Sequence, residues 1–399
     1  MRTILVAALL AFAASATAAV AAPPSPPPAP GWPKSLPAGT VIQGPGGGLV
    51  LVSARSSGGF AARAFRRDGR RIWTAAREAG CGDCNDGPQP VRLQPDGTFG
   101  PIGFDGDYIW AVDRRGRPAE ACAGVMSPDG SCVVGRSGFA PPIEAGPRPV
   151  VRGLARGVPF DSWQLVVPGY LWQDEFDVPA MTVADARGIV YVAFRNPVPG
   201  VVVGRAISGI LVAVDPVART ILWVSEGPFQ ALTGLTSGVL VAEPGGIAAY
   251  RADGTVAWRQ AIPLGQGVVP GTVVHDPSRG RVYLGRLPVG RPLSLPGVTA
   301  LDAATGDEVW NSPYTDRARL LSVGRGGRVY LAVDRAGGVA ETALRGVRAV
   351  RWSDGRAVWE RRTRLPVQGA RELVNGTVAI SAGDPSGSGH GVLTLLDPR

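Results

Sequence analysis

The sequence predicts an all-β fold built from repeated four-stranded antiparallel units. Residues 297–313, GVTALDAATGDEVWNSP, form the clearest unit: two apolar runs flank Thr305-Gly306, which is typical of two strands joined by a tight turn. Weaker copies of this stretch recur along the chain, and in the best copies a tryptophan follows the turn glycine by four residues. Self-similarity at a period of about 45 residues is typical of a β-propeller, in which each repeat forms one blade.

The tryptophans count the blades. Trp223 and Trp359 are 136 residues apart and span three steps, whereas Trp73 and Trp223 are 150 residues apart, which leaves room for two degenerate units. Residues 393–397 align with 211–215, so the last unit ends before its outer strand. We expect eight blades, with seven as the alternative if the third unit is an insertion. Residues 39–43 (GTVIQ) are expected to supply the missing outer strand, so that an N-terminal strand closes the ring.

Turn geometry and packing explain each position that recurs between copies of the repeat. Gly306 and Gly355 can take the positive φ that a tight hairpin needs. The tryptophan four residues later falls on the outer strand, where its ring can wedge between neighbouring blades. The repeat therefore predicts the ring and gives no indication of a ligand. The structural tryptophans expected are Trp73, Trp223, Trp258, Trp310 and Trp359.

The N-terminus divides into two segments before the propeller of residues 39–399. Residues 1–22 hold one early charge, an apolar run and then small residues, which is the pattern of a secretory signal peptide cleaved after Ala18 or Ala21. The alternative, a membrane anchor, is disfavoured because the apolar run is shorter than the ~20 residues of a spanning helix. Residues 23–38 predict an extended proline-rich linker. We expect a secreted or periplasmic protein, associated with the cell envelope, with no transmembrane segment after cleavage.

The chain is basic, with a formal net charge of +9, and Lys34 is its only lysine. Arginine forks suit phosphates and carboxylates, so an anionic partner such as a wall polymer or a lipid headgroup is one reading. Solvated strand faces are the simpler reading. Aromatic residues do not interleave with the arginines as a nucleic-acid platform requires, so we expect no nucleic-acid partner. Two groups stand out: Arg63, Arg66, Arg67, Arg70 and Arg71, and Arg356, Arg361, Arg362 and Arg364.

Four cysteines fit an oxidising compartment: Cys81, Cys84, Cys122 and Cys132. A covalent haem would need histidine after the second cysteine of the CGDC motif, where Asn85 stands. The second pair is also too widely spaced for a zinc knuckle. We expect two structural disulfides, paired locally or crossed.

Four units, AVDPVARTILW, AYRADGTVAW, ALDAATGDEVW and AVRWSDGRAVW, resemble the AxDxxTGxxxW repeat of the PQQ-like β-propellers. That superfamily includes quinoprotein dehydrogenases, which hold pyrroloquinoline quinone with calcium, and non-catalytic members such as the assembly scaffold of the Bam complex. This chain is closer to the non-catalytic members, because it lacks the adjacent cysteine pair of quinoprotein alcohol dehydrogenases. Glucose dehydrogenases of the soluble type use a histidine base, and the only histidines here are His275 and His390, both expected in turns.

Two carboxylate groups are candidate calcium sites, but neither follows a known calcium-loop spacing. They are Asp174, Glu175 and Asp177, and Asp105 and Asp107, which we interpret as solvated turns. We therefore expect no catalytic residue, no metal and no cofactor. The predicted function is a monomeric binding or scaffolding module for a protein or an envelope polymer. The alternative is a divergent quinoprotein-type dehydrogenase or another enzyme with a site on the ring axis.

Overall fold

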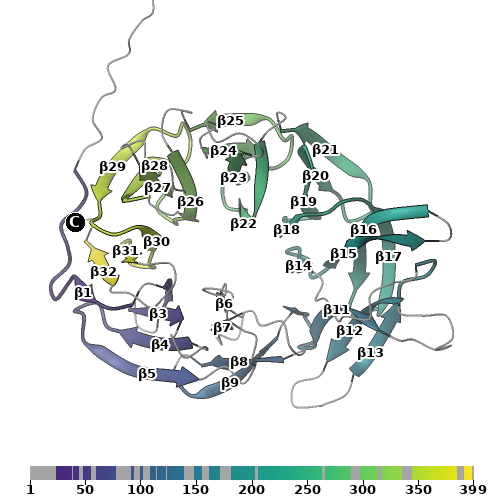
Figure 1. Ribbon diagram of the computed structural model, residues 1–399, viewed down its shortest axis with the longest axis horizontal. Helices are drawn as coiled ribbons and strands as arrows, with labels where there is room; N and C mark the ends of the chain where they lie inside the picture. The colour runs from purple at the N-terminus through teal and green to yellow at the C-terminus, as the bar shows by residue number, and fades with distance from the viewer. Residues whose placement is uncertain are drawn as a thin grey trace, which may run out of the picture.

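The chain folds into a ring of eight four-stranded antiparallel sheets, as seen in a computed structural model (Figure 1). The first strand of each sheet lies nearest the ring axis and the fourth lies at the outside. The structure describes residues 24–37, 39–44, 48–54, 60–77, 91–93, 99–101, 108–113, 115–122, 124–138, 148–154, 161–170, 181–202, 205–262, 266–288, 297–312, 317–334, 344–383 and 391–397.

The first four blades follow the chain in order, each written from its inner strand outward. Blade 1 holds β2 (Thr40–Gln43), β3 (Leu49–Ala54), β4 (Phe60–Phe65) and β5 (Arg71–Arg77). Blade 2 holds β6 (Val91–Leu93), β7 (Phe99–Pro101), β8 (Tyr108–Val112) and β9 (Pro118–Cys122). Blade 3 holds β10 (Val125–Met126), β11 (Cys132–Gly138), β12 (Arg148–Leu154) and β13 (Asp161–Val166). Blade 4 holds β14 (Met181–Ala184), β15 (Val190–Val202), β16 (Arg205–Asp215) and β17 (Thr220–Glu226).

The next three blades repeat the same order, and the last blade is completed from the N-terminus. Blade 5 holds β18 (Ala231–Gly234), β19 (Val239–Glu243), β20 (Gly246–Tyr250) and β21 (Val256–Ala261). Blade 6 holds β22 (Gln266–Asp276), β23 (Arg281–Pro288), β24 (Gly297–Asp302) and β25 (Glu308–Asn311). Blade 7 holds β26 (Arg317–Val323), β27 (Arg328–Asp334), β28 (Gly346–Arg351) and β29 (Ala357–Arg362). Blade 8 holds β30 (Val367–Glu372), β31 (Val378–Gly383), β32 (Gly391–Leu396) and, outermost, β1 (Lys34–Ser35).

The prediction of eight blades is confirmed, and the third, irregular unit is a complete blade and no insertion. The five predicted tryptophans all lie on outer strands, in blades 1, 4, 5, 6 and 7. Apolar residues of adjacent blades pack together between the sheets; one such core joins Tyr283 and Trp310 of blade 6 to Val329 of blade 7. The core is therefore a series of layers between blades, which is what alternating strand patterns predict.

The outer-strand tryptophans of blades 1, 4, 5 and 6 pack on the third-to-fourth-strand turn of the next blade. The indole of Trp310 donates a hydrogen bond of 2.7 Å to the carbonyl of Trp352, and its ring lies on Gly355 so closely that a Cβ there would be 2.9 Å away. Trp258 makes the same contacts with Ala303 and Gly306. The turn glycines, with φ of 79° and 68° at Gly306 and Gly355, are thus required both for backbone conformation and for ring contact.

The predicted closing strand was wrong. Thr40–Gln43 is the innermost strand of blade 1, and the outer strand of blade 8 is the earlier segment Lys34–Ser35, which pairs with Val392 and Leu393 of β32. The spacing explains the error: a strand that starts blade 1 is itself apolar and alternating, whereas the closing strand is two residues long and lies among prolines, so no strand pattern marks it.

The proline tract is docked on the ring, which corrects the prediction of a linker for the described part of 23–38. Ala29 donates to the carbonyl of Leu395, Leu36 donates to that of Gly391, and Trp32 is 8 % exposed. Trp32 also replaces the tryptophan that blade 8 lacks, because its indole donates a 2.8 Å hydrogen bond to the Arg67 carbonyl in the turn of blade 1. Prolines on this segment offer no N–H groups, so the covered edge of β32 cannot recruit a further strand.

Candidate functional site

The two faces of the ring are built differently. Because successive strands are antiparallel, the turns after first and third strands lie on one face, here called the turn face. The segments after second strands and the links between blades lie on the other, here called the connection face. Turn-face segments are uniformly short, whereas segments of the connection face range from two residues at 244–245 to fourteen at 167–180. Unequal insertions on one face of a rigid ring are typical of a binding surface.

Carboxylates on the turn face, close to the ring axis, hold neighbouring blades together. We define the inner rim as the turns between first and second strands at 127–131, 185–189, 235–238, 277–280, 324–327 and 373–377. The Asp185 side chain is completely buried and accepts hydrogen bonds from the backbone N–H of Ile189 (3.1 Å) and from the hydroxyl of Tyr191 (3.2 Å). It also accepts from the N–H of Gly238 in the next blade at 3.0 Å, so it joins blades 4 and 5.

Asp276 is the last residue of β22, directly before the corresponding turn of blade 6. Burial alone would raise the pKa of this carboxyl, but hydrogen bonds from Ser278 and the ion pair with Arg279 at 2.7 Å outweigh it and lower the pKa. Arg279 in turn donates to the Arg325 carbonyl of blade 7 at 2.5 Å. Burial and the nearby Asp276 raise the pKa of Tyr283 to about 12. The Asp276–Arg279 ion pair is therefore part of a fixed link between blades 6 and 7.

Glu372 links blades 7 and 8, but here the acid belongs to the later blade and its partners belong to the earlier one. Its carboxylate accepts from the Tyr330 hydroxyl at 2.7 Å and from the backbone N–H of Gly326 at 3.0 Å. Burial and the nearby Glu372 raise the pKa of Tyr330, which stays protonated and donates. Tyr191, Tyr283 and Tyr330 occupy the same place in the second strands of blades 4, 6 and 7. Tyr191 and Tyr330 donate to a carboxylate, whereas the Tyr283 hydroxyl has no hydrogen-bond partner among the described residues.

Asp185 and Asp276 are buried acids at the inner rim, whereas Arg187 beside Asp185 is exposed. The side chains of Asp185 and Asp276 are 0 % and 9 % exposed, whereas that of Arg187 is 49 % exposed. Arg325 is exposed and Arg371 is half-buried. The buried carboxylates Asp185 and Asp276 are therefore occupied by donors of the protein itself.

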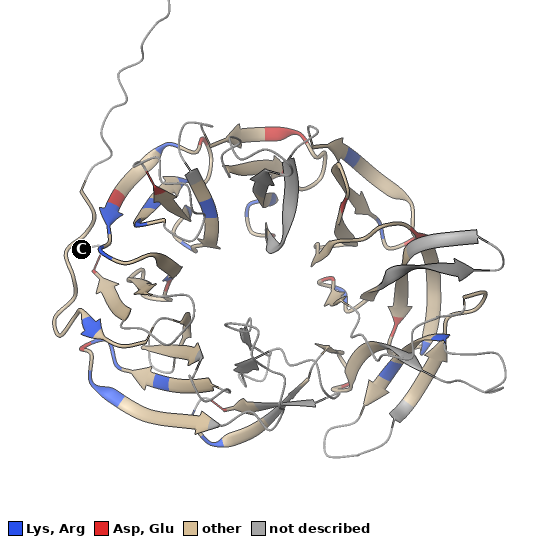
Figure 2. Ribbon diagram, viewed as in Figure 1, with Lys and Arg blue, Asp and Glu red and all other residues tan. Residues whose placement is uncertain are grey.

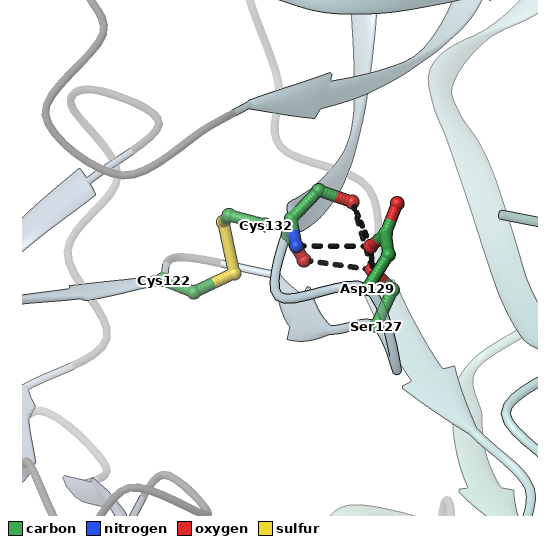
Figure 3. The surroundings of a disulfide bond; sticks show 5 residues. Cys122, Ser127, Asp129 and Cys132 are labelled. Atoms are coloured by element: carbon green, nitrogen blue, oxygen red, sulfur yellow. Dashed lines mark hydrogen bonds between the residues drawn. A yellow bond between two sulfur atoms is a disulfide. The ribbon is translucent and has the colours of Figure 1, made fainter. Parts of the chain in front are cut away.

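A second polar cluster lies at the turn of blade 3, beside a disulfide (Figure 3). Asp129 accepts from the Ser127 hydroxyl and, at 3.0 Å, from the N–H of Ser131. Burial tends to raise the pKa of Asp129, but these hydrogen bonds lower it overall. Cys122 of blade 2 and Cys132 of blade 3 form a disulfide with a Cα–Cα distance of 5.3 Å. The bond pairs the second two cysteines locally and cross-links adjacent blades.

Several predicted residues lie outside the described part of the chain. They are residues 1–22, Cys81, Cys84, Asp105, Asp107, Asp174, Glu175, Asp177 and His390. His275 is described and lies at the end of inner strand β22, where a ring nitrogen is 3.2 Å from the Gly234 carbonyl of blade 5. Burial lowers the pKa of His275, which favours the neutral ring at neutral pH. His275 therefore contributes to the contact between blades 5 and 6. No contact with another predicted site residue is seen among the described residues.

The two predicted arginine groups are partly used to close the ring. Arg67 pairs with Asp397 at 2.7 Å, and Arg361 donates to the Ser25 hydroxyl at 3.2 Å, so both hold the chain ends at the seam of blade 8. The other members on the ring surface are exposed: Arg66, Arg70, Arg71, Arg356, Arg362 and Arg364. Figure 2 shows that lysine and arginine are spread around the ring. These groups do not form a single basic patch.

Within the described ranges, no three His, Cys, Asp or Glu side chains are grouped so as to hold a metal ion. The same ranges contain no helix long and apolar enough to span a membrane.

The fold and repeat geometry can be compared with known proteins. A family model described as outer membrane protein assembly factor BamB matches residues 207–384. BamB from Moraxella catarrhalis superposes with a TM-score of 0.51 at 13 % identity, covering 90 % of this chain and 100 % of that one. The quinohemoprotein alcohol dehydrogenase of Comamonas testosteroni superposes with a TM-score of 0.57 at 15 % identity, covering 92 % and 76 %. Residues 207–384 thus match a PQQ-type repeat model, and the described ring shares its fold with these propellers.

Alcohol dehydrogenase ADHIIG from Pseudomonas putida HK5 gives the same TM-score of 0.57 at 14 % identity, with 92 % and 76 % coverage. No curated protein sequence matches the chain. The ring thus resembles BamB and two alcohol dehydrogenases alike, and at these identities the likeness concerns the fold.

The sequence patterns described above did not predict the buried acids that join neighbouring blades of the ring. A signal for them exists, because an aspartate precedes the second-strand tyrosine by six residues in blade 4 (Asp185, Tyr191) and by seven in blade 6 (Asp276, Tyr283). Blade 7 has no such aspartate and uses Glu372 of blade 8 instead. A search for the repeat around the tryptophan alone cannot find this second pattern.

Proposed function

We propose that this protein is an exported, non-catalytic binding or scaffolding module whose connection face holds a protein or a polymer of the cell envelope. The observation that carries the proposal is the asymmetry of the two faces. The turn face is short and regular, and its buried acids are committed to holding blades together. The connection face carries insertions of unequal length, which a rigid ring can present to a partner. The match to a BamB family model supports a role of this kind.

In vivo photo-crosslinking tests which face binds. A crosslinking amino acid is placed at one of two exposed positions near the ends of β29, Arg364 toward the connection face or Arg356 on the turn face. A second matched pair is Pro244 on the connection face and Asp253 on the turn face of blade 5. We expect discrete adducts in the envelope fraction from Arg364 and Pro244. Equal adducts from the turn-face positions would overturn the assignment.

Export is tested by the mass of the mature protein. We expect cleavage after Ala18 or Ala21. The docked segment begins by Pro24, so either cleavage leaves the closing strand intact. An intact N-terminus in a cytoplasmic fraction would contradict export.

The alternative reading, a divergent quinoprotein dehydrogenase, is tested directly. Purified protein is incubated with pyrroloquinoline quinone and calcium, and its thermal unfolding and dye-linked alcohol oxidation are measured. We expect neither a shift of the unfolding temperature nor activity. A clear response in both would replace the scaffold proposal by a catalytic one.

A further inference from the structure

The hairpin turn of blade 1 on the turn face carries an excess of positive charge. Residues 66–70, between β4 and β5, have the sequence RRDGR, and Arg71 begins β5. Lys34 of the closing strand β1 lies against this turn, because its Cε and Nζ atoms come within 2.9 and 3.3 Å of the position that a Cβ at Gly69 would take. Figure 2 shows basic residues on β1 and at the beginning of β5. The turn and the closing strand therefore form one continuous surface.

The equivalent turn of blade 2 extends this surface. Gly116 in that turn lies on the Trp73 ring of β5 so closely that a Cβ there would be 2.6 Å away, which makes the turns of blades 1 and 2 neighbours. Arg115, directly before this glycine, is exposed. We define the basic surface as five cationic residues of blades 8, 1 and 2: Lys34, Arg66, Arg70, Arg71 and Arg115.

The protein itself does not neutralise the basic surface. Arg67 is not counted in it, because Arg67 is paired with Asp397 at 2.7 Å. The carboxylate of Asp68 accepts a hydrogen bond of 2.9 Å from the backbone N–H of Arg70. Lys34 is half-buried and the four arginines are exposed. None of the five side chains makes a hydrogen bond or an ion pair with another residue that the structure describes.

The repeat does not require this charge, because the equivalent turns of other blades lack it. Residues 302–308 of blade 6 contain three acidic residues and no basic one. In blade 7, Arg351 and Arg356 share one acid, Asp354, at 3.5 and 3.8 Å. The excess of positive charge is therefore particular to blades 1 and 2 and the closing strand.

We propose that the basic surface docks the protein on a membrane that contains anionic phospholipids. The third-to-fourth-strand turns of neighbouring blades lie on one face of a rigid ring, so these cations can meet one lipid surface together. Each lysine or arginine held near anionic headgroups strengthens binding about fivefold. Ile72, beside Arg71, is 45 % exposed and offers an apolar side chain to the headgroup region, which favours a lipid surface over a soluble polyanion. The basic surface lies on the turn face, so this inference does not depend on the partner proposed for the connection face.

Co-sedimentation with vesicles tests the proposal. The mature protein should bind vesicles of equimolar phosphatidylglycerol and phosphatidylcholine but not vesicles of phosphatidylcholine alone, and the binding should weaken as salt is raised. Arg66→Gln combined with Arg70→Gln should weaken the binding about 25-fold, which is a factor of about five for each charge. The matched control is Arg362→Gln combined with Arg364→Gln. It removes the same charge from two exposed arginines at the connection-face end of β29 and should bind as the parent does.

Ile72→Ser distinguishes a lipid surface from a soluble polyanion. This variant should bind the anionic vesicles more weakly than the parent, because it loses the apolar side chain beside the cations. If it binds as the parent does while the Arg66 and Arg70 double variant does not, the basic surface serves a soluble polyanion and the proposal is overturned. Failure of the parent to bind anionic vesicles, or equal weakening by the control pair, would also overturn it. The substituted side chains are exposed, so all variants should unfold at the urea concentration of the parent, and their loss of binding then reports on the surface.

Discussion

Trp32→Ala should destabilise the closure of the ring between blades 8 and 1, where the N-terminal segment packs against β32. Trp32 is 8 % exposed, contacts the ring of Phe65 edge-on at 5.8 Å between centroids and donates to the Arg67 carbonyl of blade 1. It is the only indole of the described N-terminal segment and the anchor for the residues on either side. Removing it exposes the core that includes Leu393 and Leu395 of β32.

The expected cost is large for a single substitution. Truncating a buried Trp to Ala destabilises by about 3–5 kcal/mol. The lost hydrogen bond adds about 1 kcal/mol. A total of about 4–6 kcal/mol is comparable with the whole stability of many domains, which is about 5–15 kcal/mol. The short strand Lys34–Ser35 should detach as well, because two ladder residues cannot hold it alone.

Equilibrium unfolding in urea measures this cost, with two phenylalanine variants as matched controls. Trp32→Phe keeps an aromatic ring but loses the hydrogen bond to Arg67. Trp359→Phe changes a tryptophan that is 4 % exposed and whose indole N–H has no partner among the described residues, because no hairpin turn follows β32. Trp32→Phe should therefore cost about 1 kcal/mol more than Trp359→Phe.

Two results would refute the reasoning. Trp32→Ala within about 0.5 kcal/mol of the parent would show that the N-terminal segment does not close the ring, since surface substitutions stay in that range. The same conclusion would follow if a chain starting at Pro37 were as stable as one starting at Pro24, because the shorter chain lacks both Trp32 and the closing strand.

Three further predictions concern the inter-blade contacts. Gly306→Ala, where a Cβ would lie 2.5 Å from the Trp258 ring, should be more destabilising in thermal unfolding than Gly245→Ala, which has a similar φ of 80° but nothing within 4 Å; equal effects would leave only backbone strain. Cys122→Ser should cost about 2–3 kcal/mol in urea unfolding and abolish the effect of reductant at this site, and an unchanged midpoint would argue against the cross-link. Burial lowers the pKa of His275, so the unfolded state binds a proton at a higher pH than the folded state, and the free energy of unfolding should fall as the pH drops below about 6.5. His275→Gln should flatten this part of the plot of unfolding free energy against pH. An identical slope in the variant would contradict the burial of His275.

The ring could be predicted from the sequence because its information is local and repeated. Hairpin glycine and tryptophan lie four residues apart in one polypeptide segment, so each copy reports one blade, and the copies agree on the period. The contact that the tryptophan makes, with the turn of the following blade, is more than 40 residues away for Trp258 and Trp310. Its existence follows from the repeat, but its partner atoms do not.

The inner rim was not predictable to the same degree, because its pairs cross between blades without a constant sequence spacing. Asp185 reaches Gly238 from the N-terminal side, whereas Glu372 reaches Tyr330 from the C-terminal side. Both carboxylates accept a hydrogen bond from a backbone N–H group in an inner-rim turn of the neighbouring blade, which no further strand of the sheet can reach. Different residues satisfy this need in different blades, so no single motif marks them.

Closure by the first described strand also constrains how the ring forms. β1 is made before any blade and its partner β32 is made last, so blade 8 cannot be completed until the whole chain is available. The Arg67 carbonyl that Trp32 contacts lies in blade 1, only 35 residues away, so this half of the seam can form early and at low loop-closure cost. The pairing of Lys34 with Leu393 can form only after β32 has been synthesised. The seam therefore makes completion of the ring a late, long-range step, and an export signal placed ahead of Pro24 would leave that step to the far side of the membrane.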